Sequence, residues 1–378
     1  MQLLILFFKS CIYNLNSSKM KIIHICNCLR GGGIQNFLLS LLPEQAKQKH
    51  QVTLIVIEKY DYEYCEHLEN ILTKHSVNVV RLNKIRNNKL SMLKTILKCR
   101  SIVKKIKPDI VNTHGEMSHE YGAIAVLAQK IQQIITVHNA PEIWSIPLKI
   151  LCAEKPLIFC SHAAYAMRTQ NSNVMIPIDN GISREIIHSN KSVDLRKELG
   201  LNPNDKIIVS VGSLRPQKNY TFIKQIIDEI KDNTLHFCIC GGNYGIGYIN
   251  IEEFKDYPNI HCLGLRSDIS AIENGADLFL SCATFEGLPI AVLEAYFNGI
   301  PCVLSPIPQH ENISNVYQVW LPKSFNASAF SEAIKEALKN NESHDSIYKT
   351  RLSQIEKFSI SKTCNEYISF YHKILNNN

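Results

Sequence analysis

Two glutamates in one short segment are the first side chains of this sequence that could do chemistry. Glu286 and Glu294 stand eight residues apart within residues 277–304, DLFLSCATFEGLPIAVLEAYFNGIPCVL. The apolar run 277–281 predicts a buried strand, and the apolar spacing over 290–297 predicts a helix. A carboxylate just before a helix can accept hydrogen bonds from hydroxyl groups, and the helix N-terminus behind it favours an anion. The segment therefore indicates a ligand that carries both hydroxyls and phosphate.

The turn between that strand and that helix adds backbone donors. Pro289 fits the first helical turn, where its missing N–H costs nothing, and the amides around Gly287 and Leu288 are then free to face phosphate or sugar oxygens. Glu294 lies two turns into a helix that is apolar on nearly every side. A carboxylate in that setting is expected to have a function, whereas the alternative is a surface glutamate.

Two cations follow another predicted strand. Strand 207–211 is followed by the glycine turn at Gly212 and then by Arg215 and Lys218. A guanidinium fork together with an ammonium suits a diphosphate, although a solvated turn would have the same composition.

A glycine-rich loop follows the first predicted strand. Residues 28–33, CLRGGG, connect that strand to a predicted helix, and Gly32 and Gly33 allow a ligand to approach the backbone closely. The loop is neither G-x-G-x-x-G nor a P-loop, which weakens dinucleotide-binding and nucleoside-triphosphatase interpretations. A tight turn without a ligand is the alternative.

Two histidines end predicted strands. His114 follows strand 109–113 and His138 follows strand 133–137. The carboxyl ends of parallel strands meet at one edge of a sheet, so both side chains are expected near the same cleft. A single histidine more often packs than reacts; two at equivalent strand ends leave packing and function equally open.

The elements that position these residues alternate along the chain. Strands and helices follow one another from Met20, which predicts parallel sheets covered by helices on both faces. With 378 residues the chain exceeds the roughly 250–300 at which one core usually stops growing. We therefore expect an α/β protein with two Rossmann-like domains, 20–183 and 184–358, that face each other across a ligand cleft. Residues 1–19 hold an apolar run too short for a bilayer and are placed outside the fold.

The cysteine content and the charge distribution indicate the cellular compartment and the kind of ligand. Thirteen cysteines are scattered without a C-x-x-C pair, so we expect reduced, mostly buried thiols in a cytoplasmic protein. The net charge is +7, but residues 20–183 hold 20 basic and 12 acidic side chains, whereas 184–378 hold 19 and 22. An acidic ligand or an acidic surface is therefore expected to approach the N-terminal half.

Together these motifs resemble those of retaining glycosyltransferases of the GT-B fold, in particular glycosyltransferase family 4. The resemblance runs from about Lys21 to Tyr371, and its most specific part is the E-x7-E motif, Glu286 to Glu294. Other motifs fit in order and spacing: the glycine loop, TVH at 136–138, IDNGI at 178–182 where the family has PNGID, and VGSLRPQKN at 211–219. The resemblance implies a final helix, 359–378, that crosses back to the first domain.

The resemblance also implies a sugar-nucleotide donor on the C-terminal domain and an acceptor on the N-terminal domain. Glu286 would contact hydroxyls of the donor sugar, and Glu294 would hold the ribose. The backbone at Gly287 and Leu288 would bind diphosphate or sugar. His138 would touch the donor sugar near the reacting carbon. The donor implied by family frequency is a UDP-sugar, and the acceptor a saccharide or lipid-linked saccharide of cell-surface polysaccharide biosynthesis, transferred with retention of configuration.

The diphosphate would be held from both domains. Arg215 and Lys218 would stabilise it as the leaving group, and Gly32 and Gly33 would close on it from the other side. Many members have arginine directly after the glycine of this loop, where this sequence has Ser213; Arg215 is expected to substitute. Two fixed cations can neutralise the diphosphate without a metal, and no D-x-D motif occurs, so we expect no metal and no further cofactor.

A basic segment lies in the acceptor half. Residues 81–107 hold ten Lys or Arg and no acid, and Leu90, Leu93 and Leu97 lie on an apolar side together with Ile102 and Ile106. A basic amphipathic helix can lie on an anionic membrane, so this segment is a hypothesis for peripheral contact at the inner face, with an ordinary solvated helix as the alternative. The run lacks interleaved aromatics, which argues against nucleic acid. In the same domain, His114 is a candidate acceptor contact.

Two other functions remain open. A GT-B-like sugar-nucleotide epimerase or phosphorylase is weakened by the E-x7-E context and by the lack of a candidate pyridoxal phosphate lysine. A degenerate, non-catalytic sugar-nucleotide-binding protein is weakened by the presence of both glutamates, Lys218 and the glycine loop.

Overall fold

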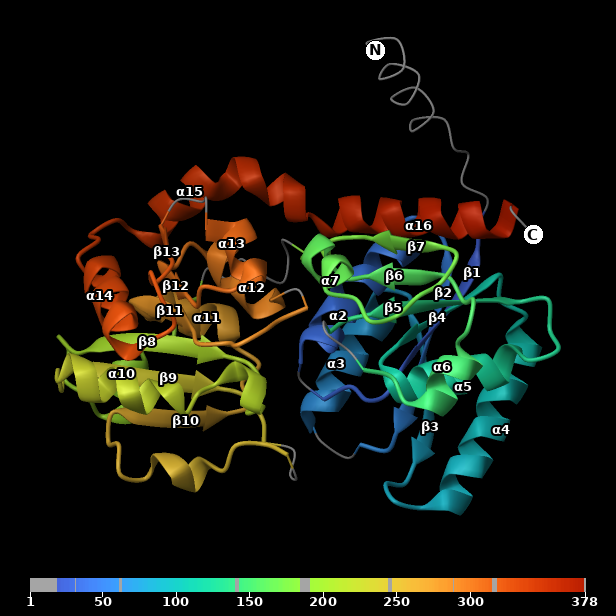
Figure 1. The fold of residues 1–378 in the computed structure, drawn as a ribbon, viewed down its shortest axis with the longest axis horizontal. Helices are drawn as coiled ribbons and strands as arrows, with labels where there is room; N and C mark the ends of the chain where they lie inside the picture. The colour runs from blue at the N-terminus through green and yellow to red at the C-terminus, as the bar shows by residue number, and fades with distance from the viewer. Residues whose placement is uncertain are drawn as a thin grey trace, which may run out of the picture.

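The computed structural model describes residues 19–376 except 31, 61–62, 140–142, 184–190, 244–246, 288 and 315–317. The predicted N-terminal extension, apart from Lys19, and Leu288 thus lie outside the described residues. Two α/β domains face each other, and the chain passes from the first to the second and back (Figure 1). The described helices include none that is long and apolar enough to cross a bilayer.

The first domain is built on a sheet of seven parallel strands in the order β3-β2-β1-β4-β5-β6-β7. Its strands are β1 Lys21–Cys26, β2 Gln51–Glu58, β3 Asn78–Lys84, β4 Ile110–His114, β5 Gln132–Val137, β6 Leu157–Phe159 and β7 Met175–Pro177. Its helices are α2 Gly33–Lys47, α3 Glu63–Lys74, α4 Lys89–Ile106, α5 Glu116–Val126, α6 Ile146–Leu151 and α7 His162–Ala166.

The second domain has six parallel strands in the order β10-β9-β8-β11-β12-β13. Its strands are β8 Lys206–Val211, β9 Leu235–Cys240, β10 Ile260–Gly264, β11 Leu278–Ser281, β12 Cys302–Leu304 and β13 Val319–Trp320. The remaining helices are α9 Leu195–Leu199, α10 Phe222–Ile230, α11 Ile269–Gly275, α12 Ile290–Asn298, α13 Pro308–Ser314, α14 Ala327–Leu338, α15 His344–Ile355 and α16 Ile360–Asn376, with short 3-10 turns at Pro216–Lys218, Ile251–Phe254 and Glu356–Phe358.

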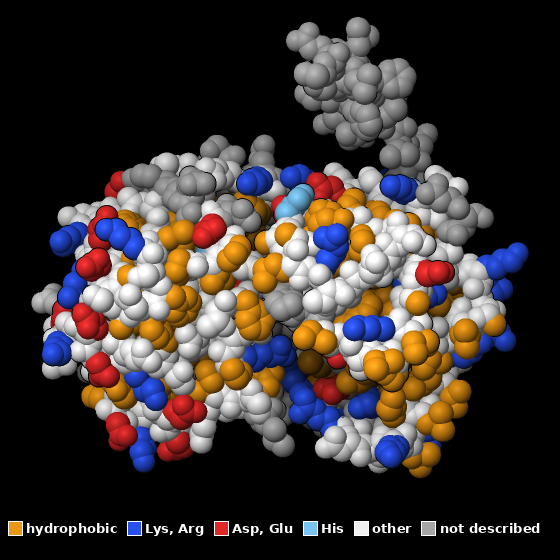
Figure 2. Space-filling view, in the orientation of Figure 1, with side chains coloured by type: hydrophobic (Ala, Val, Ile, Leu, Met, Phe, Trp, Pro, Cys, Tyr) orange, Lys and Arg blue, Asp and Glu red, His pale blue; other side chains and the backbone are white. Residues whose placement is uncertain are grey.

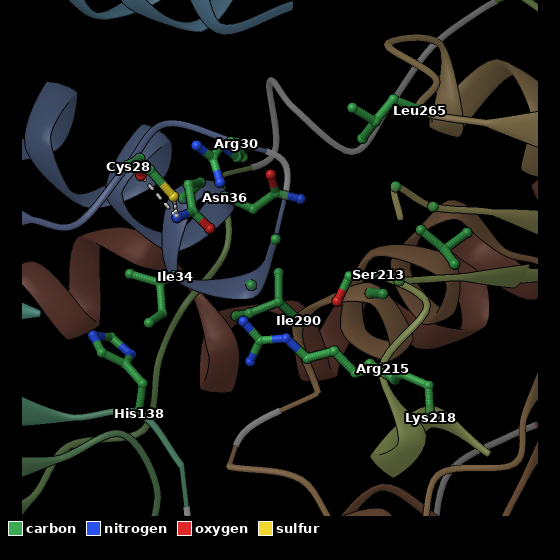
Figure 3. Close-up of a pocket in the computed structure, with 18 of the residues that line it drawn as sticks. Cys28, Arg30, Ile34, Asn36, His138, Ser213, Arg215, Lys218, Leu265 and Ile290 are labelled. Atoms are coloured by element: carbon green, nitrogen blue, oxygen red, sulfur yellow. Dashed lines mark hydrogen bonds between the residues drawn. The ribbon is translucent and has the colours of Figure 1, made fainter. Parts of the chain in front are cut away.

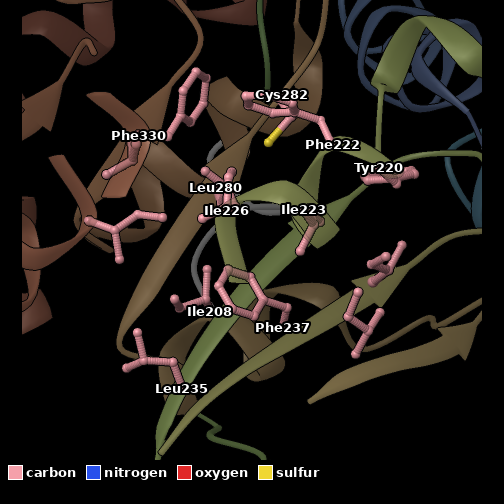
Figure 4. Packing of buried hydrophobic residues seen from close by; sticks show 14 of the residues in the cluster. Ile208, Tyr220, Phe222, Ile223, Ile226, Leu235, Phe237, Leu280, Cys282 and Phe330 are labelled. Atoms are coloured by element: carbon pink, nitrogen blue, oxygen red, sulfur yellow. The ribbon is translucent and has the colours of Figure 1, made fainter. Parts of the chain in front are cut away.

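Burial explains why these segments form strands. Every residue of β2 after the first is buried, as a parallel strand covered on both faces requires. In the second domain, apolar side chains from α10 and α14 pack on one face of the sheet, with Phe222 and Phe330 in edge-to-face contact (Figure 4). The predicted α/β class with two Rossmann-like domains is confirmed.

The strand order places the ligand site. In the first sheet the order reverses between β1 and β4, and in the second between β8 and β11. Ligands of such sheets bind beyond the carboxyl ends of the strands at this switch point. The glycine loop follows β1 and the Arg215 loop follows β8, so both stand at switch points.

The last helix crosses to the first domain, as predicted. α16 lies along the first domain, and its Tyr367 and Tyr371 are buried in one apolar cluster with residues of β1, β4 and β5 (Figure 1). The two crossings run side by side, because Ile182 N–H donates to Phe358 at 2.9 Å and Ile360 N–H donates to the carbonyl of Ile182 at 3.1 Å.

Local capping residues set the ends of several short helices. α5 begins at Glu116, since Gly115 at φ 96° supplies the N-cap, and ends at Val126. The polar stretch 183–206, in which the first domain gives way to the second, contains α9. Asp194 caps that helix by accepting from two backbone N–H groups, and Gly200 ends it in the left-handed region.

Candidate active site

A cavity of about 340 Å³ lies between the two domains. Its walls come from the carboxyl ends of strands in both sheets and from the first turns of α2 and α12, and Lys and Arg side chains gather where the domains meet (Figure 2). Of the residues predicted from the sequence, those that line the cavity are Gly32, Gly33, His114, His138, Arg215, Lys218, Glu286 and Gly287. The structure thus brings together residues separated by more than 250 positions.

Glu286 and Lys218 form an ion pair at the wall of the second domain. Oε1 of Glu286 accepts from Nζ of Lys218 at 2.6 Å, and Glu286 is only 5% exposed. A buried carboxylate is stable as an anion only with such a partner. The pair therefore holds one acceptor and one cation in fixed positions at the cavity.

Arg215 occupies the cavity even though Ser213 stands at the position next to the loop glycine. Its guanidinium lies in the cavity, and its Nε donates to the hydroxyl of Tyr248 at 3.2 Å (Figure 3). The neighbouring Ser213 and Lys218 also line the cavity, so this single loop presents two cations to a ligand.

Gly287 touches the first domain directly. A Cβ on this residue would lie 1.8 Å from the carbonyl oxygen of His138, so only glycine allows the approach. The carbonyl of Gly287 also accepts from the hydroxyl of Ser161 at 2.9 Å. The turn that precedes α12 is thereby docked onto the end of β5.

Glu294 faces the other domain and does not line the cavity with Glu286. Its carboxylate accepts from Nδ2 of Asn36 on α2 at 3.1 Å, in a contact between α12 and α2. Burial raises the pKa of Glu294 to about 7, while the hydrogen bond from Asn36 and the charge of Lys218 oppose the rise. The alternative of a surface glutamate is excluded, since Glu294 is only 9% exposed, whereas the predicted contact between Glu294 and the ribose stays a prediction.

His138 belongs to a chain of three buried histidines. Oε1 of Gln45 lies 2.9 Å from Nε2 of His24, Nδ1 of His24 lies 3.0 Å from Nε2 of His114, and Nδ1 of His114 lies 2.8 Å from Nε2 of His138. With the amide oxygen of Gln45 accepting, each ring donates from Nε2 and accepts at Nδ1. Nδ1 of His138 is then left as an acceptor.

These histidines are neutral at physiological pH. Burial lowers the pKa of His24 to about 4 and that of His138 to about 3, and burial with the neighbouring rings holds the pKa of His114 well below its usual value. His138 is therefore a hydrogen-bonding group rather than a proton donor. The two ring nitrogens of His114 are hydrogen-bonded to His24 and to His138. Neither nitrogen is left for the predicted contact with an acceptor.

Sequence reasoning missed a second charged group on the wall of the first domain. Glu58 at the end of β2 pairs with Arg30 at 3.3 Å and with Arg86 at 3.5 Å, and all three line the cavity. The one available signal was Glu58, a carboxylate directly after an apolar strand. Among the described residues, no group of three or more His, Cys, Asp or Glu could hold a metal ion.

Two facing Rossmann-like domains with a basic cavity between their strand ends define the GT-B class of glycosyltransferases. Comparison with known proteins gives the family. A model described as Glycosyltransferase Family 4 matches residues 31–173, and one described as Glycosyl transferases group 1 matches residues 192–352. The chain belongs to glycosyltransferase family 4.

Relatives with assigned reactions are distant. UDP-Gal:alpha-D-GlcNAc-diphosphoundecaprenol alpha-1,3-galactosyltransferase of Escherichia coli is 27% identical over 57% of this chain and 62% of that protein, which is less than two thirds of its length. N,N'-diacetylbacillosaminyl-diphospho-undecaprenol alpha-1,3-N-acetylgalactosaminyltransferase of Campylobacter jejuni is 22% identical over 92% of this chain and 97% of that protein.

Solved structures share the fold. Anabaena Alr3699/HepE in complex with UDP and glucose superposes with a TM-score of 0.75 at 16% identity, covering 94% of this chain and all of that one. WaaG, a glycosyltransferase involved in lipopolysaccharide biosynthesis, gives a TM-score of 0.65 at 13% identity, covering 92% of this chain and 99% of that one.

Proposed function

We propose that this protein transfers a hexose-type sugar from a nucleotide-sugar donor, which family frequency indicates to be a UDP-sugar, to a saccharide on a lipid carrier. The observation that carries the proposal is the buried Glu286–Lys218 pair, placed with Arg215 at a cavity between two GT-B domains. Support for the acceptor class comes from the two relatives, whose names give diphosphoundecaprenol-linked saccharides. Support for UDP comes from the HepE complex.

Each side chain has a task in the proposed reaction. Lys218 and Arg215 neutralise the diphosphate as it departs, in positions fixed before the reaction begins. Glu286 accepts hydrogen bonds from hydroxyls of the donor sugar, and Nδ1 of His138 accepts another. The acceptor hydroxyl attacks from the face that the diphosphate leaves and gives its proton to a phosphate oxygen, which retains the anomeric configuration. No metal takes part in this scheme.

A donor screen tests the function. The purified protein is incubated with UDP-glucose, UDP-galactose, UDP-N-acetylglucosamine, UDP-N-acetylgalactosamine and GDP-mannose, with and without EDTA, and release of nucleoside diphosphate is measured before and after addition of a GlcNAc-diphospholipid. We expect one donor to be turned over, with an activity that EDTA leaves unchanged. Release from none of the donors would count against a transferase, and loss of activity in EDTA would count against the metal-free scheme.

Our proposal that Glu294 holds the ribose requires its carboxylate, which bonds to Asn36 and does not line the cavity, to turn to the bound nucleotide. This contact gives the donor site a pH dependence. The raised pKa of Glu294 means that the carboxylate forms only as the pH rises through about 7. A carboxylate accepts from ribose hydroxyls more strongly than a carboxylic acid does, so affinity for UDP should increase from pH 6 to pH 8. Glu294→Gln should remove most of that increase and weaken UDP binding about tenfold at pH 8, which corresponds to about 1.4 kcal/mol.

Titration calorimetry of both proteins at pH 6, 7 and 8 checks this expectation. The nucleotide phosphates ionise identically in the two experiments, so the difference between the proteins isolates Glu294. If the UDP affinity of the two proteins changed with pH in the same way, Glu294 would have no part in nucleotide binding.

The structure of α4 changes which apolar side chains can take part in the membrane contact proposed for residues 81–107. The predicted single apolar side is wrong: Ile102 and Ile106 pack towards the domain core, whereas Leu90, Leu93 and Leu97 are more than half exposed on the opposite face. An exposed apolar strip on a helix rich in lysine is a feature of helices that lie in a membrane interface. Ile146 and Ile150 of α6 add further exposed apolar area to the same domain. These features support our proposal that the protein is a peripheral enzyme at the inner face of the membrane.

Flotation with liposomes tests this placement. The protein should float with vesicles that contain anionic lipid and stay in the dense fraction with neutral vesicles, because both charge and apolar area contribute. Leu93→Ser/Leu97→Ser should reduce the bound fraction severalfold. Ile251→Ser, which removes an exposed apolar side chain from the second domain, serves as the control. Binding that is unaffected by lipid charge and by the double substitution would contradict the hypothesis.

A further inference from the structure

Two arginines on the wall of the first domain share one carboxylate. Arg30 follows β1, Glu58 ends β2 and Arg86 follows β3, and these three strands are neighbours in the sheet. Glu58 holds Arg30 at 3.3 Å and Arg86 at 3.5 Å, and it is itself only 7% exposed. The group thus places two guanidinium ions and one carboxylate at the cavity.

The chemistry of this group suits a phosphate. Each guanidinium presents five N–H donors in a planar fork that matches phosphate oxygens. The Arg30 side chain is 12% exposed and the Arg86 side chain 58%, so the pair extends from inside the cavity towards its mouth. Glu58 holds both guanidinium groups in place before any ligand arrives.

This pair is separate from the cations that serve the donor. Arg215 and Lys218 belong to the loop after β8, in the other domain. In the close-up, Arg30 lies with Cys28 and Asn36 on the α2 side of the cavity, whereas Ser213 and Lys218 lie on the opposite side (Figure 3). A ligand with one diphosphate on each side of the cavity would use both groups.

The arginine pair also borders the exposed apolar face of α4. Arg86 stands between Ile85, which is 54% exposed, and Leu90, which is 61% exposed, just before and within the first turn of that helix. His138, Arg30 and Arg86 line the cavity, and Arg86 stands four residues before Leu90, so the first domain offers polar, cationic and apolar side chains. That combination matches a molecule made of sugar, phosphate and hydrocarbon.

We propose that Arg30 and Arg86, held by Glu58, bind the phosphate groups of the lipid-linked acceptor. The assignment rests on the proposed function and adds to it the residues of the first domain that recognise the acceptor. It implies that the acceptor carries its saccharide through a phosphate or diphosphate and not through a neutral linkage.

Binding of decyl diphosphate in the presence of saturating UDP tests the proposal, because UDP occupies the donor site. The wild-type protein should bind decyl diphosphate and not the uncharged decyl maltoside. Arg30→Gln/Arg86→Gln should lower this affinity at least tenfold, and Arg86→Gln alone, at an exposed position, about threefold. Lys94→Gln, which removes an equal charge from α4 outside the cavity, should have less than a twofold effect. Titration with UDP alone should give the same affinity for all variants.

Each other outcome overturns the assignment in a recognisable way. A matching loss of UDP affinity in the double variant would assign the arginines to the donor diphosphate. An equal loss of decyl diphosphate affinity in Lys94→Gln would show that general surface charge causes the effect. If the wild-type protein did not bind decyl diphosphate, the proposed site would not exist. Failure of every variant to bind UDP would instead contradict the proposed donor, which the UDP titration reports separately.

Discussion

Replacing Glu286 by alanine is expected to abolish sugar transfer while the fold persists. The substitution removes the acceptor proposed for the donor sugar and leaves Nζ of Lys218 without its partner at 2.6 Å. Loss of one preorganised polar contact at a reacting centre typically costs about 10²–10³ in turnover, and here the contact and the position of a cation are lost together. Turnover should therefore fall at least about 100-fold.

The measurement needs a structural control. Thermal unfolding by circular dichroism should remain cooperative, because Lys218 is 18% exposed at its side chain and its ammonium can turn to solvent. Glu332→Ala, an exposed glutamate on α14 of the same domain, should leave turnover unchanged. Glu286→Gln separates charge from shape, since it retains an acceptor oxygen but not the ion pair. Unchanged turnover in Glu286→Ala would refute its assigned role.

Lys218→Met, unlike Glu286→Ala, should lower both the stability and the activity of the protein. Glu286 is buried, so removal of its cation leaves an unpaired buried carboxylate, which costs roughly 3 kcal/mol of the free energy of unfolding. Turnover should also fall by about 10²-fold or more, because the departing diphosphate loses a fixed positive charge. Arg215 does not replace it, since it pairs with Tyr248 and not with Glu286.

The double variant Lys218→Met/Glu286→Gln distinguishes the two effects. It removes both charges, so most of the lost stability should return, while transfer stays absent. Denaturant unfolding and turnover of the two single variants and the double variant form the required cycle. Lys255→Met, an exposed lysine of the second domain, is the matched control. Recovery of activity in the double variant would show that Lys218 serves only to satisfy Glu286.

The repeating β/α pattern was predictable because buried parallel strands have long apolar runs, as in β2 and β9, and turn residues separate them. Short elements were not. β13 has two residues and α7 has five, and each forms because a neighbouring strand or a cap such as Ser161 is already in place. No stretch of sequence that short carries a periodic signal.

The site residues that stand together in one sequence motif were predictable, whereas those that the fold brings together from distant segments were not. Glu286, Arg215 and Lys218 stand in local motifs, and the structure puts all three at one cavity. The Arg30–Glu58–Arg86 group forms only when three strands align. His24 lies in the middle of β1, where the sequence alone gives no hint that Gln45 and His114 will meet its ring.

The path of α16 has a consequence for the order in which the protein is completed during synthesis. The second domain is a continuous insertion whose residues emerge from the ribosome together, so its core can close at once. The first domain begins earlier but needs Tyr367 and Tyr371 to cover Ile22, Ile110 and Ile134. The domain that is translated first is therefore finished last, and until α16 arrives it exposes an apolar face that a chaperone could shield.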